Sequence, residues 1–570
     1  MHMKKRIYLC GVSFFLLCIF GIMFAQQRNA WLLIEENAMS LTVKADNKPM
    51  VIEAWFSEEQ EIFYFFCPSF MVEEKISIEY DGEGKILVNG ETKREFKWDE
   101  NTRYKIETED QAYQVIFMKA QNLPALFLET NSGSMDYIHE NKLNSEEGTL
   151  TVITQEGNVQ YSGVLEEIAG RGNSTWHPYK KPYSIKLRNK RPLCGMEAGK
   201  EWKLLALYFE QDKINTKIVF EMANRLGLTE TPDCRWVDLY CNGEYRGLYL
   251  LTEAVESDTS LQGGYLVEKG VAELMEGDED WFITEKCQYC FSAKQPAVLS
   301  GKEREDISLF VQKIEDLLLD GDIRYREYID MGSLARQFLI DKITMESDAM
   351  WTSTFFQIDL QNNILKAGPL WDYDRAMGEL FTDYETPIEG APNAMAEWYM
   401  RLYDDEQFFE ELMAAYREII PYVQALLDDQ IDEYVNLISH SVAMDSVLMA
   451  EYSWVNETCS YGEYDSYVKY LKFFLASRMN YLSSVWGVED IVFNVPPSSG
   501  EFHAVTFLDE NGDIAAMNQI LDGEIIKEFP ETGYGGGTGG WYWWHGECGQ
   551  QYDSKRPIYE DTVLSKLMEE

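Results

Sequence analysis

A chain of 570 residues with 50 basic and 97 acidic side chains carries a formal charge of −47 at pH 7. This charge repels nucleic acid and anionic membrane surfaces alike, so nucleic acid is not expected as a partner. The apolar fraction of 45% and the aromatic fraction of 14% are sufficient for packed cores, which excludes a disordered chain. At roughly 100–200 residues per domain, the length predicts three or four units.

The N-terminus has the charge order of an export segment. Basic residues at positions 4–6 precede an apolar run from Ile7 to Ala25, whose length lies between a signal-peptide core and a membrane span. We expect residues 1–26 to be a signal peptide or a signal anchor, and the sequence leaves both open. Because basic flanks stay in the cytoplasm, the chain after Gln26 is expected to be extracytoplasmic, either secreted or membrane-anchored at the cell surface.

Residues 27–120 alternate apolar and polar side chains, and turn signals such as Asp81-Gly82 and Asn89-Gly90 interrupt the pattern. This pattern predicts a small β-sandwich-like module. No combination of catalytic residue types is present in it. We therefore expect a spacer or a binding module.

A new unit begins near Leu123 and contains a glycine turn followed by a strand with a lysine. The turn Gly170-Arg171-Gly172 presents backbone N–H groups that can cradle phosphates, and the arginine adds charge. The next strand projects Lys186 from an alternating pattern. Each feature alone is weak, since many such glycine pairs are only tight turns and most strand lysines face water; their order favours a phosphate site.

Two acidic residues follow in positions that suit a nucleotide site. A helix is expected from Asp212 to Arg225, and its Glu221 is predicted to reach Lys186 and fix it. Asn242-Gly243 predicts a β-hairpin between the strands on either side. Glu253 follows this hairpin, where a hinge to a second lobe is expected.

The next stretch, residues 262–297, is irregular and acidic and is predicted to be an insertion. It contains Cys287 and Cys290, which we interpret as a local disulfide or free thiols, since no second cysteine pair or histidine pair follows at zinc-ligand spacing.

The most informative stretch runs from Asp348 to Asp374. Two β-type apolar runs, 355–360 and 364–370, flank a polar turn and predict a hairpin. A hairpin returns the chain to its start, so Asp348 can converge with Asp372 and Asp374. Asp348 follows a predicted helix that is capped by Asp330. A carboxylate after a helix, a hairpin and a second acidic cluster form the layout of a kinase catalytic loop and its metal-binding aspartate. The alternative is that acids simply gather at the loop ends of a very acidic chain.

The remaining chain is mainly helical over 404–486 and changes to a compact β unit over 500–570. The stretch 505–564 resembles a surface repeat of the internalin B-repeat type, with its Gly-Trp-Tyr and Tyr-Asp landmarks. A strand-rich first lobe before a helical second lobe is the general plan of a kinase.

Taken together, four motifs resemble the CotH kinase family of atypical protein kinases over about residues 121–490. They are Arg171 to Trp176, Lys181 to Leu187, Leu239 to Tyr249, and Trp371-Asp372-Tyr373-Asp374 preceded by Asp348. The resemblance implies an α+β fold in which an atypical protein-kinase-like, two-lobed domain is flanked by small all-β modules.

The same resemblance implies ATP and Mg²⁺ as cofactors and assigns roles to individual residues. Asp348 becomes the catalytic acid–base residue. Ser353 stands where a conventional kinase loop has its metal-binding asparagine. The implied cofactor-binding residues are Arg171, Asn173, Lys186, Glu221 and Glu253, and the implied metal ligands are Asp372, Asp374 and Ser353.

The leading hypothesis is an exported kinase that transfers the ATP γ-phosphate to Ser or Thr of a surface or secreted protein. A second hypothesis is a non-catalytic surface protein on a degenerate kinase fold. A third retains ATP but transfers AMP or an amino acid, because kinase-like folds support several chemistries. The membrane is a partner only if the N-terminal segment is uncleaved.

Overall fold

The computed structural model describes most of the chain from Met39 onward. The described residues are 39–72, 75–80, 87–88, 91–92, 95–107, 112–228, 231–255, 264–270, 280–296, 298–346, 352–377, 395–450, 464–488, 490–495, 500–509, 514–527, 529, 541–543 and 556–566. The expected export segment, residues 1–26, lies outside them. Among the helices that are described, none is long and apolar enough to span a membrane.

The first part of the structure contains only strands among its described elements. They form a three-stranded sheet of order β2-β1-β6, a six-stranded sheet of order β3-β4-β11-β10-β7-β8 and the small β5-β9 pair. Its core continues into the neighbouring unit, because Phe127 and Tyr240 stack on each other and belong to the same cluster as Phe66 and Met444. The strand bounds are β1 Met39–Ala45, β2 Lys48–Glu53, β3 Trp55–Ser57, β4 Ile62–Cys67, β5 Lys75–Ile76, β6 Ile78–Tyr80, β7 Leu87–Val88, β8 Glu91–Thr92, β9 Phe96–Lys97, β10 Arg103–Glu107 and β11 Ala112–Lys119.

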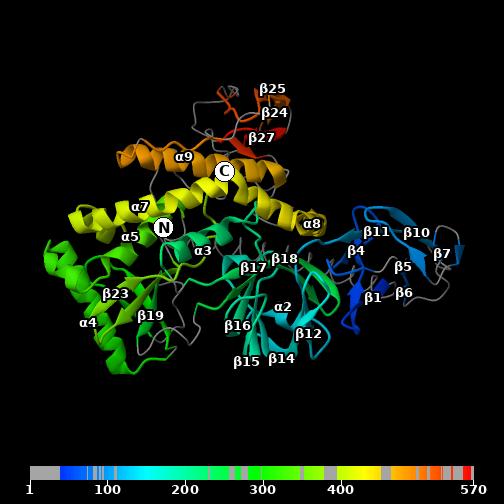
Figure 1. Ribbon diagram of the computed structural model, residues 1–570, viewed down its shortest axis with the longest axis horizontal. Coiled ribbons are helices and arrows are strands. Elements are labelled where there is room, and N and C mark those ends of the chain that lie inside the picture. Colours follow the sequence, from blue (N-terminus) through cyan, green and yellow to red (C-terminus); the bar gives the residue numbers. More distant parts are fainter. Residues whose placement is uncertain are drawn as a thin grey trace, which may run out of the picture.

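A closed seven-stranded barrel occupies the middle of the molecule (Figure 1). Its order is β12-β13-β14-β15-β16-β18-β17, and the parallel pairing of β17 with β12 closes it. Alternate side chains such as Tyr183, Ile185 and Leu187 fill its interior, as the period of two in a strand requires. The bounds are β12 Ala125–Thr130, α2 Asp136–Glu140, β13 Ser145–Ile153, β14 Val159–Gly170, η2 Ser174–Trp176, β15 Tyr183–Pro192, β16 Ala198–Leu205, α3 Asn215–Arg225, β17 Cys234–Cys241 and β18 Glu244–Glu253.

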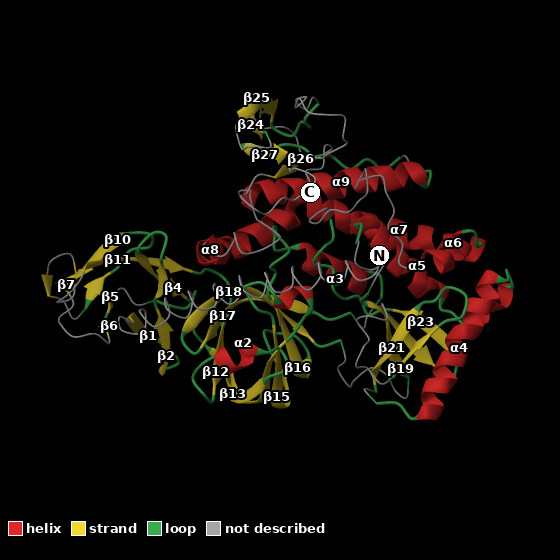
Figure 2. Ribbon diagram, turned by 180° about the vertical axis from the view of Figure 1, so that it is seen from behind, coloured by secondary structure: helices red, strands yellow, loops and turns green. Residues whose placement is uncertain are grey.

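A second sheet lies beyond the barrel, on the side away from the first strands (Figure 2). It is five-stranded and antiparallel, with the order β20-β21-β19-β22-β23. Helix α4 begins with a capping box, in which Ser300 and Glu303 bond each other's backbone, and Asp330 caps α5 through the N–H of Ser333. The bounds are β19 Tyr265–Gly270, β20 Trp281–Ile283, β21 Cys290–Gln295, α4 Gly301–Leu319, η4 Ile323–Glu327, α5 Met331–Thr344, β22 Thr354–Asp359 and β23 Ile364–Ala367.

Long helices run across both sheet-containing units, and a small C-terminal sheet of order β25-β24-β27-β26 lies beyond α9 (Figure 1). The main apolar core joins α3, α5, α7 and α9 to the outer face of the barrel and to the second sheet. The bounds are α6 Ala396–Tyr403, α7 Glu406–Ala425, η6 Leu426–Gln430, α8 Ile431–Ala450, α9 Tyr464–Val485, β24 Phe502–Leu508, β25 Ile514–Leu521, β26 Trp541–Trp543 and β27 Thr562–Lys566.

Several local predictions are confirmed. The hairpin β22–β23, the hairpin β17–β18 around Asn242-Gly243 and the helix capped by Asp330 are all present. The mixture of helices and strands confirms the α+β class. The kinase-like two-lobed plan and the domain boundaries stay predictions, and the strands from Ala125 to Glu253 close into a barrel.

One prediction is wrong: the described parts of 262–297 are not an irregular insertion. They contribute β19, β20 and β21, so β19 is the central strand of the second sheet. These strands have only three to six residues and are separated by acidic segments, which weakens the alternating signal. Cys287 and Cys290 are free thiols, so of the two alternatives for this pair the disulfide is not formed.

Candidate functional site

The glycine turn contacts the Trp371–Asp374 segment at the indole ring of Trp371. Trp371 stacks on Phe220 of α3 with the ring centroids 5.9 Å apart. The guanidinium carbon of Arg171 lies 5.3 Å from the Trp371 ring centroid, a cation–π arrangement. The structure therefore brings together two motifs that lie about 200 residues apart in the sequence.

Asp372 and Ser353 form the polar centre of the site. The Ser353 hydroxyl donates to Oδ2 of Asp372 at 3.0 Å. Both residues have left-handed backbone conformations, with φ of 61° for Ser353 and 68° for Asp372, which few non-glycine residues adopt and which cluster at functional sites.

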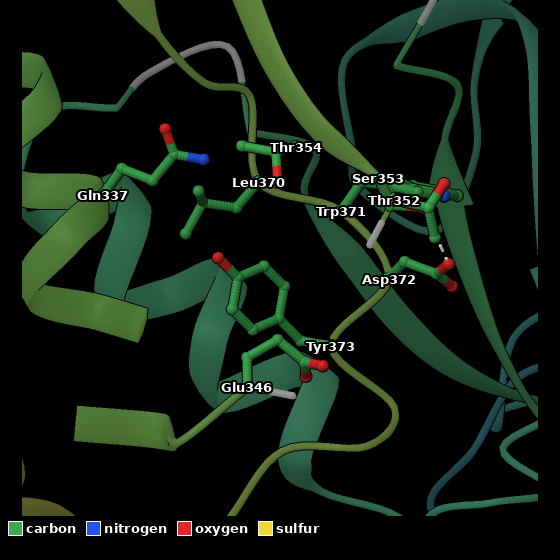
Figure 3. A pocket seen from close by; sticks show the side chains of 9 residues that line it. All are labelled: Gln337, Glu346, Thr352, Ser353, Thr354, Leu370, Trp371, Asp372 and Tyr373. Atoms are coloured by element: carbon green, nitrogen blue, oxygen red, sulfur yellow. Dashed lines mark hydrogen bonds between the residues drawn. The ribbon is translucent and has the colours of Figure 1, made fainter. Parts of the chain in front are cut away.

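A small pocket opens beside this pair (Figure 3). Its lining is polar on the side of Asp372 and combines residues of α5, the segment before β22 and the segment after β23. The lining residues are Gln337, Glu346, Thr352, Ser353, Thr354, Leu370, Trp371, Asp372 and Tyr373.

Tyr373 anchors the acidic segment to helix α5. It is 3% exposed, and its hydroxyl donates to Oδ1 of Asp341 on α5 at 2.6 Å. Burial raises the pKa of Asp341 to about 7, because desolvation disfavours the charged carboxylate. Asp374 is half-buried, and only Asp372 of the two predicted acids lines the pocket.

The predicted catalytic Asp348 lies outside the described residues. The last described residue before it, Glu346, is 2% exposed and lines the pocket. The described chain resumes at Thr352, which lines the same pocket, so the described residues on either side of 347–351 are both at the site.

The predicted pair between Lys186 and Glu221 is wrong. Lys186 faces outward from the barrel and pairs with Glu201 at 2.9 Å, because the two residues are directly opposite in the β15–β16 register. The hydrogen bond from this partner raises the pKa of Lys186. The ion pair joins Lys186 to β16 and not to α3.

Glu221 faces the helices instead. It pairs with Lys217 one turn earlier at 2.8 Å and accepts hydrogen bonds from the hydroxyls of Tyr422 and Tyr434 at 2.6 and 2.7 Å. Burial works against ionisation, but Lys217 and the two hydroxyls prevail, and the pKa of Glu221 is lowered. This carboxylate therefore ties α3 to α7 and α8.

Asn173 and Arg171 lie in a loop that backbone and side-chain hydrogen bonds hold closed. The Arg171 N–H donates to the carbonyl of Pro182 at 3.2 Å. Lys142 donates to the carbonyl of Gly172 at 2.9 Å and to Oδ1 of Asn173 at 3.0 Å. The turn therefore has a fixed shape, and its basic groups are Arg171 and Lys142.

Glu253 is the last residue of β18, and the chain leaves the barrel directly after it. Its Oε2 accepts the N–H of Asp233 at 3.1 Å, and burial raises its pKa. The structure thus places Glu253 where the chain leaves the barrel, hydrogen-bonded to Asp233 just before β17.

Sequence reasoning missed three residues at this site. Gln337 of α5, which was not singled out, is 2% exposed and lines the pocket. Thr352 lines the same pocket, and Glu268 of β19 accepts its hydroxyl at 3.2 Å. No local sequence signal distinguishes Glu268, because its position depends on the pairing of β19 with β22.

The oxygen donors at the site fit a hard divalent cation. Asp372 and Ser353 present a carboxylate and a hydroxyl at the pocket. Within the described ranges no group of three or more His, Cys, Asp or Glu side chains could hold a metal by itself. Mg²⁺ keeps several waters and is usually bound by one or two carboxylates together with substrate phosphates, so the Asp372 carboxylate could serve as one of its ligands.

A basic glycine turn beside a segment with carboxylates is a layout that a phosphotransferase would use. The comparison with protein families agrees: residues 168–482, more than half of the chain, match the model described as CotH kinase protein. The chain therefore belongs to the CotH kinase family. A search of the curated proteins found no match to it. The predicted likeness of 505–564 to internalin B repeats lies beyond the matched residues and stays a prediction.

Proposed function

We propose that this protein is an exported CotH-like kinase that transfers the γ-phosphate of ATP to Ser or Thr of a surface or secreted protein. The observation that carries the proposal is the contact group of Arg171, Trp371, Asp372 and Ser353. It joins a cation on a glycine turn to a carboxylate beside a polar pocket, which a phosphoryl-transfer site requires.

Within this proposal the residues divide the work by charge. Arg171 would offset phosphate charge from the barrel side, whereas Lys186, predicted for the same role, pairs with Glu201 on the outer face of β15 and has no described contact with this group. On the side opposite Arg171, Asp372 would hold Mg²⁺. The hydrogen bond from the Ser353 hydroxyl would fix the orientation of the Asp372 carboxylate. Mg²⁺, if held by Asp372, would supply positive charge that offsets the charge of the phosphates. Asp348 accepts the proton of the attacking hydroxyl.

The choice between Asp372 and Asp374 as principal ligand favours Asp372. Only Asp372 lines the pocket, and only its carboxylate has a described bond to Ser353. The export proposal rests on the basic and apolar N-terminal segment alone.

The test is incubation of the full chain with Mg²⁺ and ATP labelled at the γ-phosphate or, in parallel, at the α-phosphate. Asp348→Ala and Asp372→Ala are the test variants. Asp432→Ala is the matched control, because Asp432 pairs with Lys472 on the exposed side of the helices. We expect γ-label on an acceptor with the wild type and the control, and at least a hundredfold less with either test variant.

AMP transfer and a non-catalytic role would each give a distinct outcome. Transfer of α-label instead of γ-label would make the protein an AMP transferase. A wild type that neither transfers label nor binds ATP in calorimetry would contradict the kinase proposal and favour a non-catalytic surface protein.

A further inference from the structure

Glu268 lies in the middle of β19, the central strand of the second sheet, and contacts the chain just before β22. Its Oε1 accepts the Ser353 N–H at 3.1 Å and the Thr352 hydroxyl at 3.2 Å. Its Oε2 pairs with Lys294 of β21 at 3.0 Å. The side chain is 13% exposed, so these contacts are largely shielded from water.

The register of the sheet explains this reach. Glu268 is directly opposite Phe355 on β22, and Ser353 lies two residues before Phe355. Diagonal neighbours on adjacent strands lie within reach of long side chains. The pairing of β19 with β22 therefore delivers a carboxylate to the segment that precedes β22.

That segment needs an external constraint. Ser353 has a φ of 61°, a conformation that is strained for a non-glycine residue and persists only where its surroundings hold it. A hydrogen bond from its own N–H to a charged acceptor is among the stronger ones available. With its backbone held by Glu268, Ser353 directs its hydroxyl to Asp372 at 3.0 Å.

The charges along this path alternate. Lys294 is positive, Glu268 is negative, and the neutral Ser353 separates Glu268 from Asp372. Both described bonds of Oε1 go to the 352–353 segment, and Oε2 faces Lys294. Glu268 is thus engaged in holding the segment and is a poor direct ligand for a cation at Asp372.

We propose that Glu268, neutralised by Lys294, is a positioning residue for the cation and phosphate site: it sets the conformation of Ser353 and, through it, the orientation of the Asp372 carboxylate. This inference rests on the proposed function. Groups that orient metal ligands through one hydrogen bond typically change metal affinity by about 10–100-fold when they are removed.

The test measures Mn²⁺ binding to the full chain by electron paramagnetic resonance, without ATP, and the half-saturating Mg²⁺ for transfer alongside it. We expect Glu268→Ala to weaken Mn²⁺ binding about 10–100-fold. Glu268→Gln keeps one acceptor oxygen and should recover most of that loss. Lys294→Met, which leaves Oε2 without this partner, should fall between the two.

Controls separate positioning from general destabilisation. Glu524→Gln removes an acid from the exposed Glu524–Lys527 pair and should leave Mn²⁺ binding unchanged. Thermal unfolding without metal identifies any variant that fails to fold, and Glu268→Gln then carries the test.

The outcomes distinguish the inference from the function on which it rests. If the wild type binds Mn²⁺ and Glu268→Ala, folded, binds it equally well, the positioning role is refuted and the kinase proposal stands. If the wild type binds no Mn²⁺ even with ATP present, both are refuted.

Discussion

A buried ion pair between the barrel and α8 provides the sharpest test of how this fold is held together. Lys180 and Asp445 are 2.6 Å apart, with 1% and 3% of their side chains exposed. Lys180 also donates to the carbonyl of Leu248 at 2.7 Å, and Asp445 accepts the N–H of Leu248 at 3.1 Å. Lys180 belongs to the loop that begins at Arg171, so the pair also anchors the candidate phosphate turn.

The energetic expectation follows from burial. Desolvation lowers the pKa of Lys180 to about 8 even though Asp445 attracts its charge. The pair is therefore not a large net source of stability, but breaking it leaves one buried charge without its partner. Lys180→Met should lower the free energy of unfolding by about 3–5 kcal/mol, whereas Lys180→Met with Asp445→Leu should be near neutral or stabilising.

The assay is thermal unfolding of the two single variants and the double variant at pH 7. A loss of 3–5 kcal/mol corresponds to a fall in Tm of roughly 6–20 °C, and most of it should be recovered in the double variant. Lys105→Met is the control, since Lys105 pairs with Glu107 in solvent and exposed pairs contribute about 0–1 kcal/mol. Additive losses in the double variant would refute the reasoning.

Three further predictions concern Gly247, Arg171 and Asp341. Gly247 has a φ of 111°, and a Cβ there would lie 2.1 Å from Oδ1 of Asp445, so Gly247→Ala should lower Tm by several degrees; an unchanged Tm would mean that α8 packs elsewhere. Arg171→Ala should raise KM for ATP about 10-fold or more, as expected when a charged hydrogen bond is lost, and an unchanged KM in steady-state kinetics would remove Arg171 from the site. Because burial raises the pKa of Asp341 to about 7, its contribution to stability is full below pH about 4 and is lost as pH rises through 7. Urea unfolding from pH 4 to 8 should therefore show a loss of stability in the wild type that Asp341→Asn lacks, and parallel pH profiles would contradict this.

The parts of the site that sequence predicts are those specified by nearby residues. The turn of the β22–β23 hairpin and the Asp330 cap of α5 each depend on a few neighbouring side chains, whose preferences are local. This is why the return of the chain to Trp371 could be foreseen. The contact of Ser353 with Asp372 then follows from a hairpin of the right length.

The partner of Lys186 could not be predicted in the same way. Its pairing with Glu201 depends on the register between β15 and β16, which the sequence does not reveal. Glu221 therefore looked equally suitable as an ion-pair partner for Lys186. The helix face of Glu221 is decided by Tyr422 and Tyr434, which follow about 200 residues later. The role of Glu268 could not be predicted for a related reason. The position of its short strand, β19, depends on pairing with β21 and β22.

The alternation of the Trp-Asp-Tyr-Asp motif has a physical explanation in this structure. Trp371 is held from the barrel side by Phe220 and Arg171, and Tyr373 is held from the helical side by Asp341. Asp372 lies between two anchored aromatic rings and turns its carboxylate toward Ser353. Its orientation thus depends on α3 and the barrel on one side and on α5 and the second sheet on the other. The site is therefore complete only when Arg171, α3 and α5 together hold Trp371 and Tyr373 in place.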